Sequence, residues 1–156
     1  MKILDYLDES HVQYSVSEHR AAYSAQVVAA EEHERGRYVA KPVIVKADGN
    51  YIMCVLAAPH KLVFDKLRHY LGVHDVMMAG EEETRELFPD CEEGAEPPFG
   101  NLYDIRIIVD EALGCDDHIV FQAGSHDHAI HMKTEDYLLL VQPELADIAY
   151  RPDREE

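Results

Sequence analysis

The chain has 156 residues, 47% of them hydrophobic, which is enough for one domain with its own core. Its 14 Lys and Arg residues against 31 Asp and Glu residues give a formal charge of -17, which argues against broad nucleic-acid binding, DNA binding included, because neutralised phosphates drive that affinity. The N-terminus lacks a signal-peptide apolar stretch and no apolar run approaches the ~20 residues of a membrane span, so we expect a cytoplasmic protein without membrane attachment. We expect one domain over residues 1–150 and a polar, frayed tail over 151–156.

The cysteines indicate a reducing compartment. Cys54, Cys91 and Cys115 are odd in number and have no CxxC spacing, so no disulfide framework is expected. Cys54 lies within a β-rich run, and we interpret it as a small buried hydrophobic residue rather than a nucleophile.

The spacing of apolar residues predicts both helices and strands in the first half of the chain. Helices are expected over residues 3–7, over 24–34 with Ser24 as the cap and Gly36 as the end, and over 61–71 with Gly72 as the end. Strands are expected over residues 12–17, 39–46, 51–57 and 76–78, and the turn residues 47–50 predict a hairpin.

The second half begins with an acidic helix over residues 81–87 and a long polar loop over 90–102, whose prolines and glycines favour a functional role over disorder. Strands are expected over 105–109, 119–123 and 129–132, then a helix over 135–140 with Thr134 as its cap. Because strands and helices mix without strict βαβ alternation, the predicted fold class is α/β of the mixed α+β kind, a curled mixed β-sheet with surrounding helices.

Lys41 is the first residue suited to a small polar pocket. It directly precedes an apolar strand, where a lysine is a rigidly placed point charge that can hold a phosphate or ribose oxygen. The alternative is a strand-end lysine that points into solvent, as most lysines do.

The long loop supplies further candidates. Gly94 and Gly100 permit backbone conformations that other residues resist, and Pro98 stiffens the chain between them. Such a loop can present the N–H groups of Ala95 and Glu96 to an oxyanion. The alternative is an ordinary surface loop.

A histidine-rich segment over residues 125–131 contains potential metal ligands. His126 and His128 would share one strand face and His131 the other. Because HExxH and paired Cys/His spacings are missing, we expect a polar rim beside the pocket, with no metal and no cofactor. Asp110 follows a strand, where an acidic residue commonly caps the next turn; a catalytic role is the alternative. The sequence also has no GxSxG elbow and no P-loop.

Taken in order, these motifs resemble the YbaK/prolyl-tRNA-synthetase-associated domain family over nearly the whole chain. The matching positions are His19 with Ser24-Ala25, Ala40-Lys41, the loop Gly94-x-x-x-Pro98-x-Gly100, the strand end at Asp110, and Ala123-Gly124. The resemblance implies a mixed α/β fold and a free-standing, trans-editing enzyme that removes a small amino acid from mischarged tRNA.

The resemblance also implies roles for individual residues. Lys41 would position the aminoacyl-tRNA 3′ end, and Gly94 and Ala95 would belong to the catalytic loop that holds the aminoacyl group. The implied substrate-binding residues are His19, Pro98, Gly100, Asp110, Gly124 and His126.

Two departures leave an alternative open. Pro42 stands where the family often has a small polar residue, and Ala95 where many members have a second glycine. With the acidic composition, they motivate a non-catalytic binding module for a small ligand or a synthetase partner. A local basic face would offset the net charge, the alternative being scattered solvated charge; its candidates are Arg35, Arg37, Lys41, Lys46, Lys61, Lys66 and Arg68.

Overall fold

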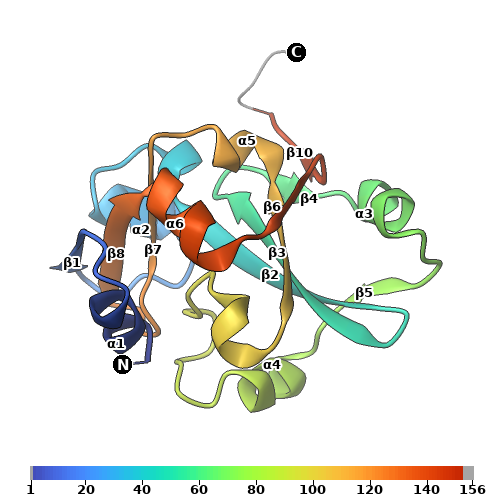
Figure 1. The fold of residues 1–156 in the computed structure, drawn as a ribbon, viewed down its shortest axis with the longest axis horizontal. Coiled ribbons are helices and arrows are strands. Elements are labelled where there is room, and N and C mark those ends of the chain that lie inside the picture. Colours follow the sequence, from blue (N-terminus) through green and yellow to red (C-terminus); the bar gives the residue numbers. More distant parts are fainter. Residues whose placement is uncertain (1, 153–156) are drawn as a thin grey trace.

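The computed structural model describes residues 2–152 and consists of three β-sheets with helices packed around them (Figure 1). No helix in this part of the chain is long and apolar enough to cross a membrane. The elements in chain order are α1 (Lys2–Glu9), β1 (Tyr14–Glu18), α2 (Ala25–Glu31), η1 (Gly36–Tyr38), β2 (Ala40–Ala47), β3 (Asn50–Ala57), β4 (Lys61–Leu62), α3 (Phe64–Leu71), β5 (Val76–Met78), α4 (Glu81–Leu87), η2 (Gly100–Tyr103), β6 (Arg106–Asp110), α5 (Glu111–Gly114), β7 (His118–Gln122), β8 (His128–Lys133), α6 (Thr134–Val141), β9 (Glu144–Ala146) and β10 (Ala149–Tyr150).

The largest sheet has the order β5-β2-β3-β6-β9 and mixes antiparallel with parallel pairs. A three-stranded antiparallel sheet, β1-β8-β7, meets it through a bridge between Val39 and Val120. The main core includes Phe99, Phe121 and Tyr137. The mixed α/β class with surrounding helices is therefore confirmed, although the strands divide into two main sheets and a short β4-β10 pair.

β2 and β3 form the predicted hairpin, with Ala47 paired to Asn50 across a two-residue turn. Both turn residues have positive φ, 47° at Asp48 and 88° at Gly49, as a type I′ turn requires. Cys54 on β3 is fully buried, and burial raises the pKa of its thiol to about 12, which confirms it as a core residue.

Helix α2 begins where the sequence predicts and ends earlier. The Ser24 hydroxyl accepts a hydrogen bond from the Val27 N–H at 3.2 Å, so Ser24 is the cap. At the other end His33 adopts φ 56°, and the Glu34 N–H donates to the Ala29 carbonyl at 2.9 Å. This is a Schellman ending with a histidine in the left-handed position, so the expectation that Gly36 ends the helix is wrong.

Other predicted boundaries are wrong because distant partners intervene. Residues 61–62 belong to β4, which pairs with β10, so α3 begins at Phe64; Gly72 closes it with φ 68° as expected. Thr134 is the first residue of α6 and Lys133 holds the cap position, so Thr134 is not the cap. The sequence pattern did not indicate α5, β9 or β10, which are short.

The C-terminal boundary also differs. Arg151 was expected in the polar tail, but its guanidinium lies 2.8 and 3.0 Å from the two carboxylate oxygens of Asp110. Only 8% of the Arg151 side chain and none of the Asp110 side chain is exposed. Arg151 therefore belongs to the folded unit; the expected fraying of residues 153–156 lies outside the described residues.

Candidate active site

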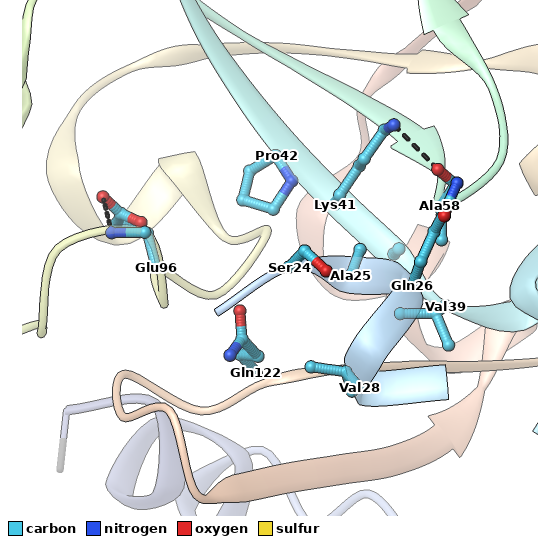
Figure 2. Close-up of a pocket in the computed structure, with 12 residues that line it drawn as sticks. Ser24, Ala25, Gln26, Val28, Val39, Lys41, Pro42, Ala58, Glu96 and Gln122 are labelled. Carbon is cyan, nitrogen blue, oxygen red and sulfur yellow. Dashed lines mark hydrogen bonds between the residues drawn. The ribbon is translucent and has the colours of Figure 1, made fainter. Parts of the chain in front are cut away.

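A pocket of about 380 Å³ opens between the N-terminal half of α2, the start of β2 and the loop that precedes η2 (Figure 2). Ala25 and Val28 of α2 give it an apolar wall. Lys41 lines it from β2, and Gly94 and Glu96 line it from the loop. The two segments that the sequence analysis singled out therefore meet in one space.

The β2 edge at the pocket is open because β5 is short. β5 pairs only with Val45 to Ala47, whereas Pro42 pairs with Val55 of β3 on the other side. A proline has no N–H to contribute to a sheet, so it is tolerated where a strand has a free edge. Pro42 therefore fits this site structurally and lines the pocket.

Lys41 is half-buried, and its ammonium donates to the Ala58 carbonyl oxygen at 2.8 Å (Figure 2). Burial lowers the pKa of Lys41, and the nearby charge of Lys61 lowers it further. The alternative of a solvated strand-end lysine is wrong. A carbonyl is neutral, so the remaining N–H donors of Lys41 stay available for an anionic oxygen.

The loop conformation is fixed by its own backbone. Gly94 has φ 85°, and the Ala95 N–H donates to the Glu92 carbonyl at 3.0 Å. The Gly124 N–H in turn donates to the Ala95 carbonyl at 2.9 Å. Ala95 is fully buried and its N–H is occupied, so the structure corrects the expectation that this N–H faces an oxyanion. The roles of Ala95 and Gly124 here are to hold the loop.

Glu96 contributes a carboxyl group that the sequence analysis did not single out. The residue is 6% exposed, and its Oε1 accepts the Gly94 N–H at 3.3 Å (Figure 2). Burial raises the pKa of this carboxyl. The signal in the sequence is weak: a single acidic residue directly before two prolines inside a stiff loop.

His126 contacts the backbone of the loop and holds it in position. Its Nε2 lies 2.7 Å from the Glu93 carbonyl and its Nδ1 lies 3.1 Å from the Ala22 carbonyl. A Cβ at Gly94 would lie 3.5 Å from the ring. His126 thus joins the loop to the turn before α2, as a support for the pocket wall.

Pro98 and Gly100 lie in the core rather than in the pocket lining. The Pro98 carbonyl accepts a hydrogen bond from the buried Tyr137 hydroxyl at 2.6 Å. At Gly100 a Cβ would come within 2.8 Å of Ile107 Cγ1, so only glycine fits without displacement. These residues anchor the loop to the sheet.

His19 and Asp110 are not brought into the pocket either. The His19 side chain is 3% exposed, and its Nε2 lies 3.8 Å from a carboxylate oxygen of Glu32. Asp110 is paired with Arg151 at the end of β6. Across residues 2–152, no group of three or more His, Cys, Asp and Glu side chains is arranged to hold a metal ion.

The family model of the aminoacyl-tRNA editing domain matches residues 19–140, and the chain therefore belongs to that family. The resemblance found in the sequence motifs is thus confirmed. The chain is similar to the multifunctional Ser/Thr-tRNA deacylase ProXp-y of Escherichia coli (strain K12), with 28% identity over 94% of this chain and 90% of the relative. A proline–tRNA ligase of Bacillus mycoides (strain KBAB4) is 28% identical over 58% of this chain and 16% of the ligase.

Solved structures share the fold at low identity. A crystal structure of a proposed trans-editing enzyme for prolyl tRNA synthetase superimposes with a TM-score of 0.83, 19% identity and 96% coverage of each chain. The crystal structure of the hypothetical protein APE2540 gives a TM-score of 0.86 at 16% identity, with 96% of this chain and all of the other chain covered.

Proposed function

We propose that this protein is a free-standing editing enzyme that hydrolyses the ester of mischarged aminoacyl-tRNA carrying a small amino acid. The observation that carries the proposal is the pocket, in which a half-buried lysine bonded to a carbonyl and a buried glutamate line the same space. Its volume of about 380 Å³ lies at the small end of ligand sites, in keeping with a small amino acid on a terminal ribose.

The chemistry follows from the charges of the substrate. An aminoacyl ester is already activated, so a bound water attacks its carbonyl without a protein nucleophile. Because the Ala95 N–H is occupied, we assign stabilisation of the developing oxyanion to the ammonium of Lys41. The Glu96 carboxylate pairs with the α-ammonium of the amino acid. A neighbouring ribose hydroxyl assists the transfer of the proton.

Specificity for a small side chain rests on the apolar wall from α2. Ala25 and Val28 leave space for a short side chain, and a larger one would meet the wall. Each additional methylene is worth about 1–3 kcal/mol of discrimination in such a pocket. Measuring which aminoacyl-tRNAs are hydrolysed therefore identifies the amino acid as well as testing the reaction.

The test is deacylation of Ala-, Ser-, Thr-, Cys- and Pro-tRNA by wild type and Lys41→Ala. Loss of an oxyanion donor predicts that Lys41→Ala lowers kcat at least about 100-fold, while circular dichroism and the unfolding midpoint stay close to wild type. The control is Lys133→Ala, an exposed lysine that does not line the pocket. Normal turnover by Lys41→Ala would contradict the proposal.

The second candidate is a non-catalytic binding module for a small ligand or a synthetase. The observation that favours it is the occupied Ala95 N–H, which removes an expected oxyanion donor. Folded protein that binds an aminoacyl-adenosine analogue and hydrolyses no member of the panel would establish it. The match to part of a proline–tRNA ligase supports a synthetase as a partner that supplies further tRNA contact in either case.

A further inference from the structure

The structure divides the seven candidates for a local basic face into those that a carboxylate neutralises and those that remain available. Several have carboxylate partners, namely Lys46 with Glu83, Lys66 with Asp147, Arg68 with Asp65, and Arg37 with Asp116. Within residues 2–152, Arg35, Lys41 and Lys61 have no carboxylate within ion-pair distance. Among these seven candidates, the available positive charge is therefore carried by three side chains.

These three residues lie beside one short segment, Ala58-Pro59. Lys41 bonds the Ala58 carbonyl, and Lys61 follows Pro59 by two positions and lies close enough to affect Lys41 electrostatically. Arg35 precedes Gly36, where a Cβ would lie 3.2 Å from Pro59 Cδ. In a protein with a charge of -17, such a local cluster of unneutralised cations favours an anionic ligand.

A second pocket, of about 690 Å³, lies beside this cluster. Arg35, Arg37 and Pro59 line it together with Glu34, whose carboxylate oxygens lie 3.2 Å from His118 Nε2 and 3.5 Å from His131 Nδ1. Gln26 lines both this pocket and the first one, so the two spaces are neighbours. The Arg37 guanidinium lies 4.7 Å from the centroid of the Tyr38 ring and donates to the Tyr38 hydroxyl at 2.8 Å. The wall of the second pocket therefore includes the planar guanidinium of Arg37, held in place by Tyr38. Nucleic-acid bases stack on planar groups of this kind.

We propose that this second pocket binds the nucleotide that precedes the terminal adenosine of the tRNA acceptor strand, with its phosphate between Arg35 and Lys61. The inference rests on the proposed function, because it requires the aminoacyl ester to occupy the first pocket. The tRNA strand then passes from the first pocket along Gln26 into the second pocket. Guanidinium groups pair well with phosphate, and single-stranded nucleotides are recognised by charge and stacking.

The binding test uses uncharged tRNA and fluorescence anisotropy at several salt concentrations, with Arg35→Glu and Arg68→Glu as a matched pair. Both variants change the net charge equally, but Arg68 is already paired with Asp65 on α3. Arg35→Glu is expected to weaken binding about tenfold and to reduce the slope of log affinity against log salt by about 0.7. Arg68→Glu is expected to change affinity less than about twofold.

A second measurement separates this inference from the proposed function. Arg35→Glu should raise the KM for aminoacyl-tRNA and leave the hydrolysis of 3′-aminoacyl-adenosine, which lacks the preceding nucleotide, unchanged. If wild type hydrolyses neither substrate, the proposed function fails while the binding test still stands. Wild-type tRNA affinity in Arg35→Glu would overturn the inference. So would competition by free AMP as strong as that by a CCA oligonucleotide, which would indicate a mononucleotide site.

Discussion

At the scale of single residues, the carboxyl group of Glu96 lines the pocket and, when it is charged, lowers the stability of the fold. Burial raises its pKa, so the folded state binds a proton more readily than the unfolded state does. Folding stability therefore falls as the pH rises from the ordinary glutamate pKa of about 4.3 through the raised value. Above that window the charged carboxylate is present and ready to pair with an ammonium group.

Glu96→Gln keeps the shape and the acceptor of this side chain and removes the charge. We expect its thermal midpoint to exceed that of wild type at about pH 8 and to approach it below about pH 3.5, where most of the glutamate is protonated in both states. Its KM for aminoacyl-tRNA should rise about tenfold because a hydrogen bond to a charged group is lost.

Thermal unfolding from acidic to alkaline pH and steady-state deacylation measure these two effects. Glu86→Gln is the control, since Glu86 is exposed on α4 and should change neither quantity. A Glu96→Gln variant that is destabilised at alkaline pH, or that keeps the wild-type KM, would contradict the assignment.

At the scale of elements, the loop before η2 is held in one conformation from several directions. Gly94 supplies a positive φ, His126 bonds the Glu93 carbonyl, and Gly124 bonds the Ala95 carbonyl. The Gly94 N–H also bonds the Glu96 carboxyl, so the backbone of the loop aims a functional side chain. A shift of the loop would therefore change the pocket as well as the local stability.

Gly94→Ala and Gly72→Ala test this link as a matched pair. Both glycines have positive φ, 85° and 68°, so each alanine should destabilise the fold by about 1–2 kcal/mol. Gly72 closes α3 far from the pocket, whereas relaxation at Gly94 moves Glu96. Only Gly94→Ala is expected to lose activity, by about tenfold or more, in deacylation assays run beside urea unfolding. Equal activity in the two variants would show that the loop does not position the site.

The elements that were predicted correctly depend on local chemistry. The β2–β3 hairpin follows from Asp48-Gly49, and the start of α2 follows from the Ser24 cap. In the site, the same reasoning placed Lys41 and Gly94 in one pocket. Motif order alone thus identified the family and the two sides of its pocket.

What could not be predicted depends on long-range pairing and on the direction of single groups. β4 forms because β10, far along the chain, pairs with it. The Ala95 N–H donates its hydrogen bond to the Glu92 carbonyl because a turn brings the two groups together, and the sequence does not reveal this turn. The burial of Glu96 likewise requires the folded loop.

At the scale of the whole molecule, the C-terminal segment closes the fold. β9 extends the main sheet beside β6, and β10 pairs with β4 (Figure 1). Arg151 then neutralises Asp110, which is fully buried at the end of β6 and also accepts the Ile148 N–H at 3.2 Å. Because a buried unpaired carboxylate is costly, this pair makes the sheet depend on a residue near the end of the chain.

Arg151→Ala should therefore destabilise the protein by about 3–5 kcal/mol in urea unfolding, because it leaves Asp110 buried without its partner. Arg106→Ala is the matched control, since Arg106 also contacts a carboxylate through two nitrogens, at Glu144, but its side chain is 51% exposed; we expect less than about 1 kcal/mol. Adding Asp110→Asn to Arg151→Ala should recover part of the loss, because an amide can be buried without a counter-charge. If the double variant is no more stable than Arg151→Ala, the loss comes from the packing of the arginine rather than from the stranded charge.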